Sequence, residues 1–292
     1  MKLTVTVITH NEAHNIAAAL ESVAWADEII VVDSNSTDET VAIARQYATH
    51  VETRAWPGYG AQKNHAAGLA SNDWILSIDA DERVSLDLAY EIRGLMQAGP
   101  TVAGYRVPRV TRYLGRWVRS TDWYPDYQLR LYDRRAGCWN DRRVHESVEL
   151  REPPGRLRHE LHHYAYREVS HHLATMNRYT TLAAEQLMLE GTRTNALAIV
   201  VHPPLAFLRN YILRGGIRDG SVGLLVSALN ACYVFLKYVK LWELQHSQRQ
   251  NAHSPVPELP SHRAPELPSS RTTELPASRP SEPRTPSPEP RR

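Results

Sequence analysis

Short apolar runs alternate with stretches of helical spacing over the first hundred residues. Four runs rich in β-branched or apolar residues predict strands at 3–9, 28–32, 50–53 and 74–78. Apolar residues recur at helical spacing over 15–23, 36–47 and 61–70, and Ser36 with Glu39 has the spacing of a capping box. Strands that alternate with helices predict an α/β fold with a Rossmann-like, mostly parallel sheet.

Polar residues follow three of these predicted strands directly. The first strand ends in Thr9 and is followed by Asn11 and Glu12, and the second is followed by Asp33. The fourth ends in Asp79 and is followed by Asp81. Because the carboxyl ends of parallel strands meet at one edge of a sheet, where ligands bind, this convergence favours a ligand site over a set of unrelated turns.

The two aspartates suit a metal ion. Magnesium and manganese prefer oxygen ligands and are held by one or two carboxylates together with substrate phosphates, which fits Asp79 and Asp81. Neither a GxGxxG nor a GxxxxGK[ST] motif occurs in this first unit, so a diphosphate needs another counter-charge. We expect a Mg²⁺ or Mn²⁺ ion to supply it, helped by Lys63, although a surface helix lysine is an equal alternative.

Composition, charge and cysteine content indicate the cellular compartment and the kind of binding partner. With 292 residues and 42% hydrophobic content, the chain can fold into more than one subdomain. The net charge is only +2, but arginines crowd between residues 106 and 167, which indicates an anionic partner or a membrane surface. Cys138 and Cys232 have no metal-site spacing, and no apolar run near Met1 predicts a signal peptide. We therefore expect a cytoplasmic protein.

Four ordered motifs carry a family resemblance. They are VITHNE at 7–12, IVVDSNSTD at 30–38, QKN at 62–64 and IDADE at 78–82. In order and spacing they resemble family 2 glycosyltransferases of the GT-A fold, and the branch they resemble most is the β-1,4-glucosyltransferase group of the lipopolysaccharide inner core. The resemblance implies that Thr9, Asn11, Glu12 and Asp33 hold the uridine of a UDP-sugar. It also implies that Asp79 binds ribose or sugar and that Asp81 binds the metal.

The middle of the chain is expected to bind the acceptor. Strand pieces are predicted at 102–107 and 109–118 around a turn, and at 127–132. Aromatic residues lie among the arginines here, a mixture that suits phosphorylated glycans and also single-stranded nucleic acid. Because an α/β unit with paired aspartates precedes this region, we favour carbohydrate and expect no nucleic-acid partner. We therefore divide the enzyme domain into a donor half at 1–97 and an acceptor half at 98–167.

An inverting transfer needs a base for the acceptor hydroxyl, and two carboxylates are candidates. Glu146 lies in a VHESV segment that resembles the His-Glu segment of the glucosyltransferase branch, and Asp126 precedes the predicted strand at 127–132. His145 is a candidate third metal ligand. The histidines between 159 and 172 could form a zinc site, but a strand-to-helix junction is the preferred interpretation.

Apolar helices follow at 168–246. Helical spacing covers 168–190, and apolar stretches follow at 196–208 and 222–241. The last stretch approaches the length of a membrane span, but basic and aromatic neighbours favour amphipathic helices that lie on the cytoplasmic face of the inner membrane. A helical hairpin is the third alternative. Residues 247–292 carry a Pro-rich repeat of eight residues and are expected to be disordered.

The sequence therefore predicts an inverting, metal-dependent glycosyltransferase that moves a hexose, glucose in the preferred interpretation, from a UDP-sugar to the lipopolysaccharide inner core. A lipid-linked glycan is the expected acceptor. Within the same fold, transfer to polyprenyl phosphate or to another envelope glycan is the alternative. A non-catalytic module that binds nucleotide-sugar or glycan is the alternative from a different class.

Overall fold

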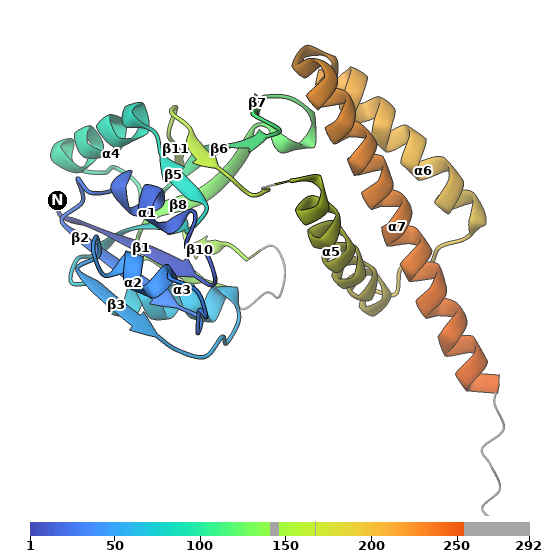
Figure 1. Ribbon diagram of the computed structural model, residues 1–292, viewed down its shortest axis with the longest axis horizontal. Coiled ribbons are helices and arrows are strands. Elements are labelled where there is room, and N and C mark those ends of the chain that lie inside the picture. The colour runs from blue at the N-terminus through green and yellow to red at the C-terminus, as the bar shows by residue number, and fades with distance from the viewer. Residues whose placement is uncertain (141–145, 167, 254–292) are drawn as a thin grey trace, which may run out of the picture. The chain divides into compact units, whose positions relative to one another are not determined.

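The structure is a computed structural model that describes residues 1–140, 146–166 and 168–253 (Figure 1). Side chains are described up to residue 247. Most of the predicted tail at 247–292, and the candidate ligand His145, therefore lie outside the described residues. Residues 1–252 form one compact unit.

Four parallel strands build the first half of a ten-stranded sheet. They lie in the order β3-β2-β1-β4 and span Leu3–Thr9 (β1), Glu28–Asp33 (β2), His50–Thr53 (β3) and Trp74–Asp79 (β4). In the register, Thr9 pairs with Asp33, and Ile8 pairs with Asp79. The three polar strand ends therefore meet at one edge, as predicted from the alternating pattern.

The second half of the sheet is mixed and continues in the order β8-β6-β12-β5. Its strands span Glu82–Val84 (β5), Gly104–Tyr113 (β6), Asp126–Asp133 (β8) and Leu161–His163 (β12). β8 pairs antiparallel with β4 and β6, and β12 lies between β6 and the edge strand β5. Short strands at Arg116–Val118 (β7) and Gly155–Arg156 (β11) also pair with β6, while Gly137–Trp139 (β9) and Val148–Leu150 (β10) form a separate two-stranded sheet.

The predicted division of this region into pieces at 102–107 and 109–118 is wrong. Pro108 lies inside β6 and pairs with Tyr127, so the strand continues to Tyr113. The turn comes after it, at Leu114 and Gly115, which both have positive φ angles of 47° and 81°. A glycine suits such a position because it has no Cβ to clash in the left-handed region.

Helices pack on both faces of the sheet, and their contacts form two apolar cores. Helices α1 (Ile16–Glu21), α2 (Thr40–Ala44) and α4 (Leu86–Ala98) contribute to one core, and α3 (Tyr59–Gly68) to the other. In α4, Leu88, Ile92 and Met96 are buried at a spacing of four residues, and Ser85 caps the helix by accepting a hydrogen bond from the Leu88 N–H at 3.2 Å.

The predicted capping box at Ser36 and Glu39 is wrong. Helix α2 begins at Thr40 and has no side-chain cap at Glu39. The Ser36 hydroxyl instead donates a hydrogen bond to Asp33 and accepts one from the Asn11 N–H. The serine therefore organises the loops at the carboxyl edge of the sheet, and α2 is shorter than the predicted 36–47.

Three long helices form the C-terminal part, with a turn between the last two (Figure 1). They are α5 (Val169–Leu189), α6 (Ala196–Leu208) and α7 (Gly220–His253), and Lys240 of α7 donates hydrogen bonds to Asn177 of α5. Gly215 and Gly220, with φ angles of 71° and 60°, lie in the turn. Because α7 continues to His253, the predicted boundary at 246/247 falls inside a helix. The predicted fold class, an α/β domain followed by C-terminal helices, is confirmed.

Candidate active site

Loops after β1 and β2 are tied together by Asn11. Its backbone N–H donates to the Ser36 Oγ at 2.8 Å, and its side-chain Oδ1 accepts from the Thr37 N–H at 2.8 Å. Asn11 has a φ angle of 54°, which asparagine tolerates better than most residues. The residues predicted to hold a nucleotide therefore belong to one hydrogen-bonded pair of loops.

Asp33 lies at the base of these loops and is fully buried. Its two carboxylate oxygens accept hydrogen bonds from the N–H and the hydroxyl of Ser36. Nearby in the register, Thr9 is buried, and its Oγ1 makes no hydrogen bond with the part of the chain that the structure describes. Glu12 follows in the first loop and accepts a hydrogen bond from Asn15 at 2.9 Å.

Lys63 of α3 is buried, with only 2% of its side chain exposed, so the surface-lysine alternative is wrong. Its Nζ lies 3.1 Å from Oδ1 of Asp79 and 3.3 Å from Oε1 of Glu146. It also lies 4.3 Å from the centre of the Trp139 ring, which stabilises a cation. Asp79 and Asp81, separated by Ala80, form a DxD pair. One ammonium group therefore joins the first aspartate of this pair to Glu146, the preferred candidate base.

The ion pairs continue from Asp79 through the interior of the sheet. Arg130 lies 2.7 Å from Asp79 and 2.6 Å from Glu82, and both Arg130 and Glu82 are buried. Arg109 lies 2.9 Å from Glu82 and 2.7 Å from Asp126. Charges therefore alternate along the path from Asp126 to Asp79 and on through Lys63 to Glu146. Each buried charge has a partner of opposite sign, as low dielectric surroundings require.

The two candidate bases lie at opposite ends of this path. Both oxygens of Asp126 accept hydrogen bonds, Oδ2 from Arg109 and Oδ1 from the Gln128 side chain at 2.6 Å. Glu146 is 19% exposed and lies within hydrogen-bond distance of Lys63 through Oε1. Glu146 therefore lies close to the DxD pair through Lys63, whereas the Asp126 carboxylate is occupied by its hydrogen bonds with Arg109.

The surroundings of the two aspartates favour their ionised forms. Burial acts to raise the pKa of Asp79, but Arg130 and Lys63 outweigh it and hold that pKa well below its usual range. Burial likewise acts to raise the pKa of Asp81, but the adjacent His163 overcomes it and the pKa lies below its ordinary value. Both carboxylates are therefore negatively charged near neutral pH.

His163 is a site residue that the sequence did not single out. It lies at the end of β12, its Nε2 is 3.3 Å from Oδ2 of Asp81, and its Nδ1 is 3.1 Å from the Thr111 hydroxyl. The only sequence signal was its place among the histidines at 159–172. Within the described residues, no group of three His, Cys, Asp or Glu side chains gathers in a metal-binding arrangement.

Comparisons with known proteins agree on one family. Residues 4–148 match the family described as Glycosyl transferase family 2. The lipopolysaccharide core biosynthesis glycosyltransferase LpsC of Rhizobium meliloti is 30% identical over 250 residues, which cover 83% of this chain and 93% of LpsC. An uncharacterized glycosyltransferase of Rickettsia felis is 30% identical over 263 residues, which cover 83% of this chain and 90% of that protein.

A solved structure shares part of the chain. Glucosyl-3-phosphoglycerate synthase from Mycobacterium tuberculosis, crystallised with Mn²⁺, UDP and glucosyl-3-phosphoglycerate, is 23% identical over 38% of this chain and 44% of that chain, with a TM-score of 0.33. The family assignment rests on the match over residues 4–148 and on the near full-length similarity to LpsC. The chain therefore belongs to glycosyltransferase family 2 and is a glycosyltransferase.

Proposed function

We propose that this enzyme transfers a hexose, with inversion, from a UDP-sugar to a sugar of the lipopolysaccharide inner core, and that UDP-glucose is its donor. Two observations support the proposal. LpsC, whose name assigns it to lipopolysaccharide core biosynthesis, is similar over nearly its whole length. In addition, the polar strand ends, the DxD pair and a carboxylate held by Lys63 lie together at one sheet edge.

The loops after β1 and β2 are the proposed nucleotide site. Thr9, Asn11, Glu12 and Asp33 are the residues that we assign to the uridine. The buried Thr9 hydroxyl, which has no hydrogen-bond partner within the described residues, is a free group for a ligand at this position. Asp33 would act by fixing the Ser36 loop, since its own oxygens are engaged there.

Asp81, Asp79 and His163 are the residues that would hold a divalent metal ion, although their side chains are not gathered in a metal-binding arrangement within the described residues. Asp81 lies beside the His163 imidazole, and the two oxygens of Asp79 face Lys63 and Arg130. All three side chains are partly exposed. These donor types suit Mn²⁺ or Mg²⁺. When bound, the ion would neutralise negative charge on the departing diphosphate. His145, which lies outside the described residues, stays a predicted further ligand.

Glu146 is the proposed base. It accepts the proton of the acceptor hydroxyl on its carboxylate, while the acceptor oxygen forms a bond to the sugar carbon and the bond from that carbon to the UDP oxygen breaks. Attack from the face opposite UDP inverts the configuration. Lys63 positions the Glu146 carboxylate and Asp79 together, which fixes the base relative to the donor site.

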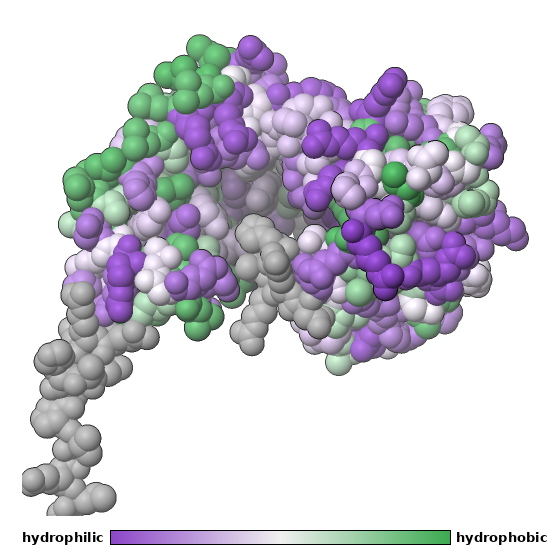
Figure 2. Space-filling view, turned by 180° about the vertical axis from the view of Figure 1, so that it is seen from behind, coloured by the Kyte–Doolittle hydropathy of each residue, from purple (hydrophilic) through white to green (hydrophobic). Residues whose placement is uncertain are grey.

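The C-terminal helices are proposed to bind the cytoplasmic face of the inner membrane. Two segments, Ala196–Leu213 and Gly216–Ser247, are long and apolar enough to cross a membrane, and only 6% of the first is buried. Leu197, Val200 and Leu205 of α6 are 55–70% exposed. Figure 2 shows an apolar band along these helices. An interfacial position buries this band and brings the enzyme to a lipid-linked acceptor.

A nucleotide-sugar panel tests the proposal. Release of the nucleoside diphosphate from UDP-glucose, other UDP-sugars and GDP-sugars should be measured with Mn²⁺ or Mg²⁺, for the wild type and for Asp81→Ala and Glu146→Ala. Turnover that is specific for a UDP-hexose and lost in both variants supports the proposal. A module that only binds nucleotide-sugar shows no turnover to lose, which contradicts it.

A further inference from the structure

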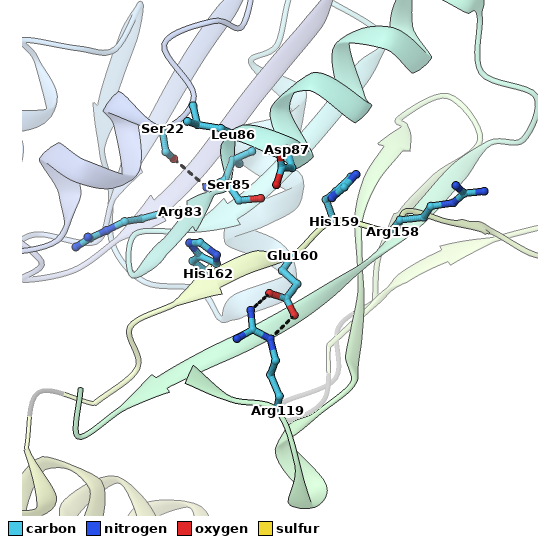
Figure 3. Close-up of a pocket in the computed structure, with 11 residues that line it drawn as sticks. Ser22, Arg83, Ser85, Leu86, Asp87, Arg119, Arg158, His159, Glu160 and His162 are labelled. Atoms are coloured by element: carbon cyan, nitrogen blue, oxygen red, sulfur yellow. Dashed lines mark hydrogen bonds and ion pairs between the residues drawn. The ribbon is translucent and has the colours of Figure 1, made fainter. Parts of the chain in front are cut away.

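A cavity of about 650 Å³ lies against β5 and β12 and is lined by residues that the proposed reaction does not use (Figure 3). The two strands are antiparallel, and Arg83 faces His162 while Glu82 faces His163 in the register. Because side chains alternate between the two sides of a strand, Arg83 and His162 project away from the side of Glu82 and His163. The cavity is therefore distinct from the pairing of Asp81 with His163.

The lining combines basic ends with a centre of mixed polarity. In Figure 3, Arg83 and Arg158 extend at opposite ends, with hydroxyl, imidazole and carboxylate groups between them. These central groups belong to Ser85, Asp87, Glu160 and His162. A concave site of about 300–1,000 Å³ with a few convergent polar groups is the usual form of a small-molecule site.

The net charge of the lining favours an anion. Three arginines, Arg83, Arg119 and Arg158, face two carboxylates, Asp87 and Glu160, so three positive and two negative charges leave a net +1. Arg119 neutralises Glu160 through two hydrogen bonds, from Nε at 3.1 Å and from its terminal nitrogen. Asp87 lies in the first turn of α4, where the helix dipole compensates a negative charge.

Arg158 is the arginine of the lining that is open to a ligand, because its side chain is exposed. Arg119 is paired with Glu160. The Arg83 guanidinium lies 3.8 Å from the centre of the Tyr164 ring and donates a hydrogen bond to the Asn15 Oδ1 at 3.5 Å. An anionic group in the cavity would therefore meet Arg158.

Two further contacts hold the wall of the cavity in place. The His162 ring, which lines the cavity, lies 4.3 Å from the Trp117 ring. The Arg119 N–H donates to Asp219 at 3.1 Å, so the cavity wall is fastened to the turn that precedes α7.

We infer that this cavity, which we call the Arg83–Arg158 pocket, binds a sugar that bears a phosphate or carboxylate group, as the part of the acceptor remote from the reacting hydroxyl. Arg158 pairs with the anionic group, and Asp87, Ser85 and His162, which lie between Arg158 and Arg83, hydrogen-bond to the sugar hydroxyls. Its role as an acceptor subsite rests on the proposed transfer, whereas the binding of an anionic sugar does not.

Direct titration tests the pocket without the donor. Glucose 6-phosphate, glucose and inorganic phosphate should be titrated by ligand-observed NMR into the full chain and into the variants Arg158→Gln, His162→Gln and Arg93→Gln. Arg93 is an exposed arginine of α4 outside the pocket and is the matched control for the loss of one charge. UDP affinity is measured in every variant to show that the donor domain is intact.

We expect glucose 6-phosphate to bind more tightly than glucose or phosphate, and Arg158→Gln to weaken it about tenfold, the loss of one charge-assisted hydrogen bond. His162→Gln should also weaken it, while Arg93→Gln and the UDP affinities stay unchanged. The inference is overturned if phosphate binds as tightly as glucose 6-phosphate, or if Arg158→Gln has no larger effect than Arg93→Gln. If the pocket passes this test but the wild type turns over no nucleotide-sugar, the anionic-sugar site stands and its assignment to an acceptor is wrong.

Discussion

The Nζ of Lys63 lies 3.3 Å from the Oε1 of Glu146, although the two residues are 83 positions apart in the chain. The same ammonium group is 3.1 Å from Asp79. A buried lysine therefore holds the proposed base next to the DxD pair.

Replacing Lys63 with methionine keeps much of the side-chain volume and removes the shared charge. We expect kcat to fall about 100-fold, because Glu146 and Asp79 lose the group that positions them. The free energy of unfolding should fall by about 2 to 3 kcal/mol, less than for fully buried pairs because the Asp79 and Glu146 side chains are 29% and 19% exposed. Steady-state kinetics measures kcat, and urea unfolding measures the free energy of unfolding. Lys2→Met, at an exposed lysine, is the control. A kcat within twofold of the wild type would contradict the positioning role.

Metal binding should depend on His163 as well as on Asp81. The His163 imidazole lies 3.3 Å from the Asp81 carboxylate, so His163→Ala removes a proposed ligand and should weaken Mn²⁺ binding about 10- to 100-fold in the presence of UDP. Electron paramagnetic resonance titration of Mn²⁺ gives the affinity. The exposed His50→Ala should leave the affinity unchanged. If His163→Ala binds Mn²⁺ as the wild type does, His163 is not a ligand.

Stability should fall in mild acid because of His172. This histidine is buried beside Tyr113, and burial followed by the charge of His171 lowers its pKa from 6.5 to about 4. Between these values the unfolded chain binds more protons than the folded one, so stability decreases as the pH falls. The contribution is about 2 kcal/mol between pH 7 and pH 5.

His172→Phe isolates this effect, because phenylalanine keeps an aromatic ring against Tyr166 and never takes a proton. We expect the stability difference between pH 7 and pH 5, measured by chemical denaturation, to be about 2 kcal/mol smaller in the variant. Equal pH dependence in the two proteins would show that His172 protonates as easily in the folded state as in the unfolded chain.

Membrane binding should depend on the exposed face of α6. Leu197 in α6 and Tyr90 in α4 are 70% and 69% exposed, so Leu197→Glu and Tyr90→Glu place the same charge at positions of equal exposure. Only Leu197→Glu should weaken binding to vesicles of phosphatidylethanolamine and phosphatidylglycerol, by about tenfold. Cosedimentation of the full chain with the vesicles measures this affinity. Equal binding by both variants would mean that α6 does not contact the lipid.

The donor half could be predicted from the sequence because its pattern is local. β1 and β3 have the predicted bounds, and the strand that ends at Asp79 places the DxD pair where expected. Four ordered motifs then identified the family. In these segments each strand carries its own signal, namely a short run of β-branched or aromatic residues that ends in a polar turn.

Features that depend on distant strand pairing could not be predicted. His163 meets Asp81 because β12 inserts between β6 and β5, a pairing that no local pattern reveals. No local pattern shows that Glu82 and Arg130 meet inside the sheet, where their pairing makes the burial of both charges tolerable. Ser36 had the spacing of a helix cap, but its hydroxyl bonds to Asp33, an alternative that short polar side chains always offer near turns.

Substitution of each candidate base shows which carboxylate takes the proton of the acceptor hydroxyl. The rate of UDP release from UDP-glucose should be compared for the wild type, Glu146→Gln and Asp126→Asn, with Mn²⁺ and a lipopolysaccharide acceptor whose core is truncated. We predict that Glu146→Gln lowers kcat about 1,000-fold with unchanged UDP affinity, and that Asp126→Asn lowers it about 10-fold by loosening Arg109. Near wild-type turnover by Glu146→Gln, or a larger loss in Asp126→Asn, would contradict the proposed mechanism.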